Sequence, residues 1–317
     1  MVRENTVTIA HISDVHLSPI AGFGPRHWNV KRALGYINWH RSRKRVCRAD
    51  IVADIVADMK AQTPDHIAVT GDLVNVGLPQ ELAAARLWLE NLGSPDAVSV
   101  IPGNHDIYVP MRRDEGVQRW ADYMSPDSYG AAFSVGDSGF PYVRRIGHVA
   151  LVGVNSAIPT PVFVAAGRVG QKQRSALGRI LDKLRADGLV RVVLIHHPPL
   201  PGQASPRRAL VDAHEFREVL EQHGAELVLH GHNHRNMRTY ADGKRGKIPV
   251  IGIASGSYAI AKDVGVLARY NLLRFTRRED VDRIDLVGRG LKKNNGPIVE
   301  LERTELSPHQ IETGASK

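Results

Sequence analysis

Residues 7–16 read VTIAHISDVH, an apolar run that ends in the polar side chains of Asp14 and His16. A short run of this kind, rich in β-branched residues and apolar on both faces, predicts a buried strand. Similar runs, each bounded by turn-forming residues, recur at 7–12, 66–70, 98–101, 149–154, 191–195, 226–229 and 248–254. We therefore expect a strand at each of these places.

Amphipathic helical patterns lie between several of these runs, at residues 50–62, 82–92, 171–186 and 214–223. In the first, Ile51, Ile55 and Met59 recur at helical spacing and form one apolar stripe. Strands that alternate with helices in this way predict α/β architecture, with the strands buried between helical layers.

Two parts of the chain lack these patterns. Residues 110–147 have weak periodicity and many Gly, Pro, Ser and Asp, so we expect an excursion that caps the site or packs on its edge. After Phe275 the pattern fades again. We therefore divide the chain into one domain, residues 1–275, and a C-terminal tail, residues 276–317, packed on the domain or partly mobile.

The composition is that of an ordinary globular protein, with 43% hydrophobic and 24% charged residues among 317. Cys47 is the only cysteine, so no intrachain disulfide can form and an oxidising compartment is not implied. The first residues show no signal-peptide pattern, and no window approaches the roughly 18 apolar residues of a spanning helix. We therefore expect a cytoplasmic location.

Polar motifs follow the predicted strands where each strand gives way to a turn. They read Asp14-Val15-His16, Gly71-Asp72, Gly103-Asn104-His105-Asp106, His196-His197-Pro198-Pro199 and Gly231-His232-Asn233-His234. In α/β sheets the loops at C-terminal strand ends converge and form ligand sites. Each motif alone has an ordinary explanation, such as a turn, an N-cap or a hydrogen-bonded core histidine. Five of them together at strand ends favour a metal site.

The residue types in these motifs favour transition metals. Asp-x-His and His-x-His place two ligands on one side of an extended chain. Mixed oxygen and imidazole ligands suit Zn, Mn or Fe rather than Ca. Seven candidate ligands are too many for one tetrahedral site. They suit two ions, about 3.5–4 Å apart, that share a bridging carboxylate.

In order and spacing, the five motifs resemble those of the calcineurin-like metallophosphoesterases, over roughly residues 7–258. The resemblance implies two mixed β-sheets packed face to face and flanked by helices. It also implies a metal-dependent hydrolase with two divalent ions that cleaves phosphodiester or pyrophosphate bonds. By position, the implied ligands are Asp14, His16, Asp72 and His234 for one ion, and Asp72, Asn104, His196 and His232 for the other. The family's histidine ligand lies two residues before a proline, which favours His196 over His197.

The resemblance also assigns chemistry to neighbours of the ligands. His105 is similar to the family histidine that stabilises the transition state or protonates the leaving oxygen, and we take His105 and Asp106 as catalytic candidates. Asp106 and His197 are candidates for orienting ligands, with a packing role left open for His197. A water or hydroxide between the ions would be ionised near neutral pH and would attack phosphorus.

A basic segment follows the first motif. Between Arg26 and Arg48 the chain has eight Lys or Arg and no Asp or Glu, which accounts for nearly all of the net charge of +9. Trp28, Tyr36 and Trp39 lie among these charges. The mixture fits peripheral contact with an anionic membrane, a nucleic-acid groove, or a solvated basic face.

Several substrates stay open for an enzyme that acts on anionic phosphate esters. One is a cyclic nucleotide or glycerophosphodiester. The basic segment is locally similar to that of some UDP-diacylglucosamine pyrophosphohydrolases, which implies a lipid-linked substrate at the inner membrane face. Nucleic acid is disfavoured because no separate DNA-binding domain is visible. A non-catalytic anion-binding scaffold is the alternative outside the enzymes, and it is disfavoured because no ligand is missing.

Overall fold

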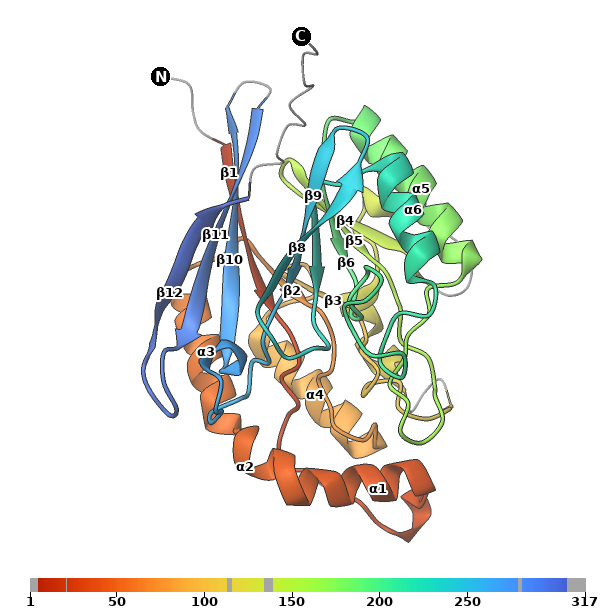
Figure 1. Ribbon diagram of the computed structural model, residues 1–317, viewed down its shortest axis with the longest axis vertical. Helices are drawn as coiled ribbons and strands as arrows, with labels where there is room; N and C mark the ends of the chain where they lie inside the picture. The colour runs from red at the N-terminus through yellow and green to blue at the C-terminus, as the bar shows by residue number, and fades with distance from the viewer. Residues whose placement is uncertain (1–4, 21, 113–115, 134–138, 279–280, 307–317) are drawn as a thin grey trace.

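Two β-sheets packed face to face, with helices on the outside, form the body of the protein (Figure 1). The computed structural model describes residues 5–20, 22–112, 116–133, 139–278 and 281–306. Both sheets contain parallel and antiparallel pairs. The predicted α/β fold of two mixed sheets flanked by helices is therefore confirmed.

The first sheet has the strand order β12-β11-β10-β1-β2-β3. Its strands are β1 (Asn5–Ile12), β2 (His66–Val69), β3 (Val98–Val100), β10 (Arg269–Arg278), β11 (Val281–Leu291) and β12 (Ile298–Glu305). Strands β1, β2 and β3 run parallel, whereas β10, β11 and β12 form an antiparallel extension beside β1. The parallel strands place their C-terminal ends at one edge of the sheet.

The second sheet has the order β4-β5-β6-β7-β9-β8. Its strands are β4 (Tyr142–Ile146), β5 (Val149–Gly153), β6 (Val190–Leu194), β7 (Leu227–His230), β8 (Met237–Gly243) and β9 (Gly246–Gly252). Strands β5, β6, β7 and β9 are parallel neighbours. Across both sheets, all seven predicted strands are present within two residues of their predicted bounds.

Helices lie around the two sheets. They are α1 (Val30–Asn38), α2 (Lys44–Val46), α3 (Ala49–Ala61), α4 (Pro79–Leu92), α5 (Gln171–Ala186) and α6 (Ala213–His223). The four predicted helices are α3 to α6, each within three residues of its predicted bounds. Helices α3 and α4 pack on the first sheet and α5 and α6 on the second, whereas α1 lies at one end of the molecule (Figure 1). None of the helices in the described ranges is long and apolar enough to cross a membrane.

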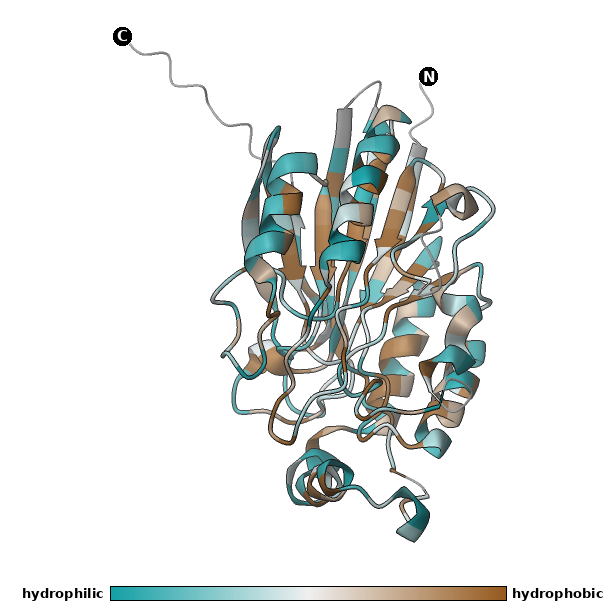
Figure 2. Cartoon of the chain, turned by 90° about the vertical axis from the view of Figure 1, so that its right-hand side faces the viewer, coloured by the Kyte–Doolittle hydropathy of each residue, from teal (hydrophilic) through white to brown (hydrophobic). Residues whose placement is uncertain are grey.

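The strands are buried on both faces, which explains their continuous apolar sequences. In β5, Val149 and Leu151 join the core that links the two sheets, while Ala150 and Val152 join the core under α5 and α6. This alternation follows from the two-residue period of a strand. Apolar residues concentrate on the strands, and polar residues on the outward faces of the helices (Figure 2).

Residues 110–147 pack on the edge of the sheets. Where described, they form two short 3-10 segments (Val117–Met124 and Gly130–Phe133) and the edge strand β4, which pairs with β5. The buried Trp120 donates its indole N–H to the carbonyl of Leu82 in α4. Of the two predicted arrangements, the described part of this stretch therefore shows packing on the edge.

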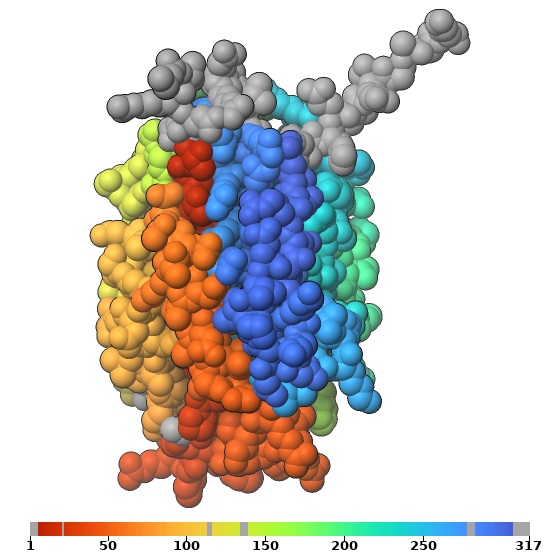
Figure 3. Space-filling model, turned by 90° about the vertical axis from the view of Figure 1, so that its left-hand side faces the viewer, coloured from red at the N-terminus to blue at the C-terminus, as the bar shows by residue number. Residues whose placement is uncertain are grey.

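Beyond residue 275 the structure contains strands that the sequence does not predict. Residues predicted as a C-terminal tail include the end of β10 and all of β11 and β12, so they extend the first sheet as far as Glu305. These strands lie beside α3 (Figure 3), and Arg289 of β11 forms a salt bridge of 2.8 Å with Asp58 of α3. The strand signal is weak because β11 and β12 each mix charged and apolar residues. Residues 307–317 of the predicted tail lie outside the described residues.

Candidate metal centre

The seven predicted ligands come together where the C-terminal ends of both sheets meet. Asp14 and His16 follow β1, Asp72 follows β2 and Asn104 follows β3. From the second sheet, His196 follows β6, and His232 and His234 follow β7. Because these are parallel strands, their C-terminal loops converge, as predicted from the motifs.

The convergent side chains form two groups that share one carboxylate. Asp14, His16, Asp72 and His234 make up the first, and Asp72, His196 and His232 the second. Within each group the potential ligand atoms all lie within 4.8 Å of one another. Asn104 completes the second group, since its Oδ1 lies 2.8 Å from Nδ1 of His232 and 3.2 Å from Nε2 of His196.

Five of the seven predicted ligands have left-handed backbone conformations. The φ angles are positive for Asp14 (53°), His16 (42°), Asp72 (56°), His232 (69°) and His234 (51°). A non-glycine residue in this region costs about 1–3 kcal/mol, and such strain concentrates at functional sites. The loops are thus shaped to aim these side chains at one place rather than to relax their own backbone.

Glycines let the loops approach one another closely enough for this. A Cβ atom at Gly103 would lie 2.2 Å from Oδ1 of Asp72, and one at Gly231 would lie 2.3 Å from Oδ2 of Asp14. Both distances are far shorter than van der Waals contact. The glycines of the Gly-Asn-His-Asp and Gly-His-Asn-His motifs therefore leave room for the predicted carboxylate ligands.

Hydrogen bonds outside the groups orient the imidazole rings. Nδ1 of His16 lies 3.0 Å from the carbonyl of Val74, and Nδ1 of His196 lies 2.7 Å from the carbonyl of Thr70. A carbonyl only accepts, so both Nδ1 atoms carry a proton, and in the neutral rings Nε2 presents a lone pair to the centre. Nδ1 of His234 is held 2.8 Å from the hydroxyl of Tyr258.

The potential ligand atoms lie close enough together to share a cation. Nε2 of His16 lies 3.2 Å from Nε2 of His234, and Nε2 of His234 lies 3.0 Å from Oδ1 of Asp14. Nε2 of His196 lies 3.5 Å from Oδ2 of Asp72. Lone pairs that face each other at these distances repel unless a proton or metal ion lies between them. The donor set therefore fits divalent metal ions with mixed nitrogen and oxygen ligands.

Electrostatics at the shared carboxylate support the same interpretation. Burial opposes the charge on Asp72, but the imidazoles of His196 and His105 outweigh it and hold the pKa of Asp72 well below its usual value. Burial also opposes the charge on His196, but Asp72 outweighs burial and raises the pKa of His196 to about 9. Without a metal, a proton on His196 thus compensates Asp72, and a bound metal ion would displace that proton.

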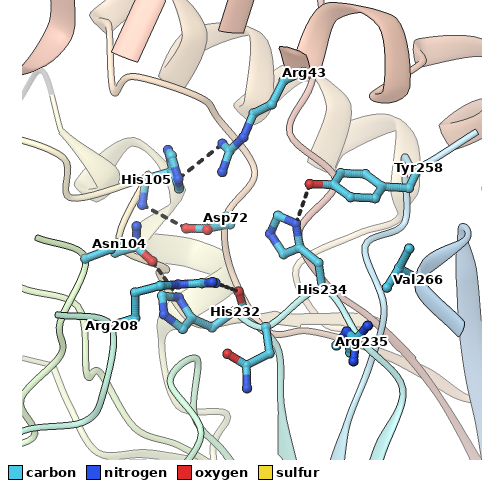
Figure 4. A pocket seen from close by; sticks show the side chains of 12 residues that line it. Arg43, Asp72, Asn104, His105, Arg208, His232, His234, Arg235, Tyr258 and Val266 are labelled. Carbon is cyan, nitrogen blue, oxygen red and sulfur yellow. Dashed lines mark hydrogen bonds between the residues drawn. The ribbon is translucent and has the colours of Figure 1, made fainter. Parts of the chain in front are cut away.

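A pocket of about 320 Å³ lies over the two groups (Figure 4). Its lining residues are Arg43, Asp72, Asn104, His105, Ala165, Arg208, His232, Asn233, His234, Arg235, Tyr258 and Val266. Among the described residues, none between 110 and 147 lines it. The pocket therefore gives solutes access to Asp72, which both groups share.

His105 faces this pocket, whereas Asp106 does not line it. Nδ1 of His105 donates to the carbonyl of Asn75, which leaves Nε2 directed to Nη1 of Arg43 at 3.2 Å. Burial and the charge of Arg43 lower the pKa of His105 to about 4. The ring is therefore neutral at neutral pH in the free protein and accepts a hydrogen bond at Nε2.

Asp106 holds the loop that carries Asp72. Its two carboxylate oxygens accept four backbone N–H bonds of 2.8–3.1 Å, from Gly103, Asp72, Leu73 and Val74. All of its bonds thus serve to shape the backbone. We therefore interpret the predicted catalytic candidate Asp106 as a positioning residue.

His197 is buried beside the candidate centre and packs against the ring of a predicted ligand, His232. Its ring nitrogens contact the Ser156 hydroxyl at 2.8 Å and the Ala165 carbonyl at 3.2 Å. The ring packs against that of His232, with 4.5 Å between the ring centroids. The two interpretations of His197 left open by the sequence, orientation of a ligand and packing, therefore describe the same contact.

Three residues near the centre have no signal in the sequence motifs. Tyr258 contacts His234, Arg208 donates to the carbonyl of His232 at 2.8 Å, and Arg43 contacts His105. The sequence points indirectly to Arg43 alone, since this residue belongs to the basic segment that follows the first ligand motif. Which of its eight basic side chains would enter the pocket depends on tertiary packing.

Comparison with known proteins agrees with the fold and the motifs. A probable cyclic nucleotide phosphodiesterase of Synechococcus sp. is 28% identical over 186 residues, which cover 58% of this chain and 63% of that protein. The glycerophosphodiester phosphodiesterase GpdQ of Enterobacter lignolyticus is 28% identical over 237 residues, which cover 71% of this chain and 70% of that protein. The chain thus spans less than two thirds of the length of the first of these relatives.

Solved structures share the fold at low sequence identity. A dimetal phosphatase from Danio rerio matches with a TM-score of 0.61 and 15% identity, over 94% of this chain and 99% of that chain. A purple acid phosphatase from yellow lupin matches with a TM-score of 0.54 and 12% identity, over 94% of this chain and 53% of that chain. The family model of the calcineurin-like phosphoesterases matches residues 7–236, which include every predicted ligand. The chain therefore belongs to the calcineurin-like phosphoesterase family.

Proposed function

We propose that this protein is a dinuclear-metal phosphohydrolase that cleaves phosphodiester or pyrophosphate bonds. The observation that carries the proposal is the pair of ligand groups that share Asp72 at the floor of an open pocket. Two divalent ions (Mn, Fe or Zn) held there would supply an activated water as nucleophile and would neutralise charge on the phosphoryl oxygens. The names of the two phosphodiesterase relatives support a diester substrate.

In this proposal each residue has a distinct task. Asp14, His16 and His234 would hold one ion, Asn104, His196 and His232 would hold the other, and Asp72 would contribute to both. His105 presents Nε2 to the pocket, where it can bind the leaving oxygen or the transition state. An anionic phosphate beside His105 favours the charged form of the ring, which can then donate a proton.

Hydrolysis of a chromogenic diester tests the proposal. Purified protein should hydrolyse bis(p-nitrophenyl) phosphate with Mn²⁺ and lose this activity on chelation. A panel of cyclic nucleotides, glycerophosphodiesters and UDP-diacylglucosamine would then identify the substrate. Two bound ions without hydrolysis of any phosphoester would favour the non-catalytic scaffold instead.

The second candidate function is a pyrophosphohydrolase that cleaves a lipid-linked substrate at a membrane surface. The exposed face of α1 favours this candidate. Trp28, Val30, Leu34 and Ile37 are 69%, 63%, 38% and 44% exposed. The last three recur at i, i+4 and i+7, so they form one apolar stripe on the helix. Such a stripe flanked by basic residues suits an anionic lipid surface, with the ring of Trp28 at headgroup level.

Several residues of the basic segment are buried, so only part of the segment is available to a membrane. Trp39 is only 3% exposed and packs in a small core with Ile20 and Leu78, so of the two tryptophans in the basic segment only Trp28 could contact a membrane surface. Lys31 and Arg32 are buried and donate to backbone carbonyls. The basic residues that remain exposed around α1 are Arg26, Arg41, Lys44 and Arg45.

A further inference from the structure

We infer that Arg43, assisted by Arg208, forms an anion-binding subsite beside the metal ligands and contacts the non-bridging oxygens of a bound phosphate group. The inference rests on the proposed function and adds residues that the family motifs do not contain. Arg43 and Arg208 extend into the pocket from opposite sides of the ligand cluster (Figure 4). Arg43 comes from the segment that follows the first ligand motif, and Arg208 comes from the loop between β6 and α6.

Arg43 is held in place at both ends of its segment. It closes a π-helical turn, Trp39–Arg43, in which Lys44 N–H donates to the carbonyl of Trp39. The buried side chain of Trp39 fixes the start of this turn. Just beyond its end, the backbones of Cys47 and Tyr258 form an antiparallel β-bridge. Single π-helical turns are rare and often occur at functional sites. The turn thus delivers a long side chain to a defined place in the pocket.

The charge of Arg43 has no acidic partner in the described part of the chain. Within the described residues, the guanidinium of Arg43 forms its one hydrogen bond with His105, and that of Arg208 forms its one with the carbonyl of His232. By contrast, Arg235, which lines the same pocket, forms a salt bridge of 2.7 Å with Asp263. A half-buried guanidinium beside a cation site and without a counterion is unfavourable unless an anion joins it.

A phosphate group supplies that anion in the required geometry. A guanidinium offers a planar fork of N–H donors that matches two phosphate oxygens. With its ester at the metal ligands, a phosphate would direct its remaining oxygens toward the pocket walls, where Arg43 and Arg208 lie. Because Arg208 is exposed, solvent screens it more, so we expect it to contribute less than Arg43.

Binding of inorganic phosphate to the Mn²⁺-loaded protein, measured by titration calorimetry, tests this subsite. Arg43→Ala should weaken binding roughly 10–100-fold, which corresponds to one hydrogen-bonded charged contact. Arg43→Lys should fall between Arg43→Ala and wild type, because it keeps the charge and loses the fork. Arg208→Ala should have a smaller effect, of a few-fold.

Arg41→Ala is the matched control. Arg41 belongs to the same π-helical turn, is exposed, and carries the same charge. Equal losses in Arg41→Ala and Arg43→Ala would show a diffuse charge effect and overturn the inference. So would loss of metal in Arg43→Ala, or phosphate binding as tight as that of wild type.

This experiment separates the subsite from the proposed function. Phosphate binding that depends on Arg43 in a protein that hydrolyses no phosphoester would contradict the proposed function and leave the subsite standing. Hydrolysis by a protein whose phosphate binding ignores Arg43 would support the proposed function and overturn the subsite.

Discussion

The ligand loops and the basic segment differ in how their side chains are directed. The seven predicted ligands come from five loops far apart in the sequence and all point to one centre. The eight basic residues between Arg26 and Arg48 are close in sequence and go to different places. Lys31 is buried, Arg43 enters the pocket, and Arg41 and Lys44 face solvent.

Side-chain length and backbone geometry explain this difference. Asp, Asn and His are short, so the backbone of a strand end largely determines where their donor atoms lie. At this centre the left-handed φ angles and the close glycines make that control tighter. Lys and Arg have long, rotatable chains whose direction is set by what packs around them. A motif of short residues therefore predicts a position, whereas a run of basic residues predicts only a charge.

The largest expected effect concerns the shared ligand. Asp72→Ala should lose at least one ion and reduce hydrolysis by several orders of magnitude, because both groups depend on this carboxylate. Elemental analysis and turnover of the diester measure the two effects. Asp54→Ala, which removes the same charge from an exposed site on α3, should change neither. Full activity with two ions per chain in Asp72→Ala would rule out the assignment.

The next effect separates chemistry from metal binding within the ligand loops. His105→Ala should keep both ions, because His105 is in neither ligand group, and should lower turnover about 10²–10⁴-fold. If His105 protonates the leaving oxygen, the loss should be smaller for substrates with good leaving groups. Loss of metal in this variant would instead make His105 a structural residue.

A third prediction tests whether the solvent-facing part of the basic segment binds membranes. The protein should co-sediment with anionic vesicles at low salt and be released by added salt. Replacing Arg41, Lys44 and Arg45 by Ser should abolish sedimentation, since each charge contributes about 1 kcal/mol near an anionic leaflet. Hydrolysis of a small soluble diester should persist, because Arg43 is kept.

The apolar stripe of α1 offers an independent variant of the same test. Leu34→Ser together with Ile37→Ser should weaken sedimentation, whereas Leu87→Ser, at an exposed apolar position of α4, should not. Sedimentation of wild type that ignores anionic lipid at low salt would remove the membrane interpretation and favour a soluble substrate.

The smallest effect compares two lysines of the basic segment. Lys31 donates to the carbonyls of Tyr108 and Thr160 at 2.9 Å, whereas Lys44 is exposed. Lys31→Ala should lower the free energy of unfolding by about 1–3 kcal/mol, and Lys44→Ala by less than about 0.5 kcal/mol. Equal effects in chemical denaturation would contradict the division of the segment into buried and exposed parts.

Lys31 also predicts a pH dependence. Burial lowers the pKa of Lys31 to about 8, against about 10.4 in an unfolded chain. Between these values the unfolded chain binds the additional proton, so the contribution of this group to stability rises as the pH increases from about 8 to about 10. Lys31→Ala should lack this rise, and an identical pH profile in both proteins would show that Lys31 is not desolvated.

The sequence predicts the parts of the fold that are buried on both sides. Strands such as β5 and β6 have continuous apolar runs because each face packs on a core. The sequence does not predict β8 or β12, in which exposed residues, most of them charged, lie among less exposed ones. In β12 part of the pairing depends on tertiary contacts, such as the salt bridge of Glu302 with Arg269. The sequence alone does not predict such contacts, because they join residues that only the fold brings together.

The candidate site likewise has a part that the sequence predicts and a part that it does not. All seven predicted ligands lie together because the motifs mark strand ends that the topology brings side by side. Arg43, Arg208 and Tyr258 escape prediction because no short motif surrounds them and their directions depend on neighbouring elements. The roles of Asp106 and His197 likewise follow from their hydrogen bonds in the structure and not from the sequence.

Anomalous scattering from a crystal of the Mn²⁺-loaded protein would test the central claim most directly, namely that two metal ions share Asp72. We predict two peaks about 3.5–4 Å apart. One should lie among Asp14, His16 and His234, and the other among Asn104, His196 and His232, with Asp72 between them. A single peak, or a second peak that does not contact Asp72, would contradict the claim.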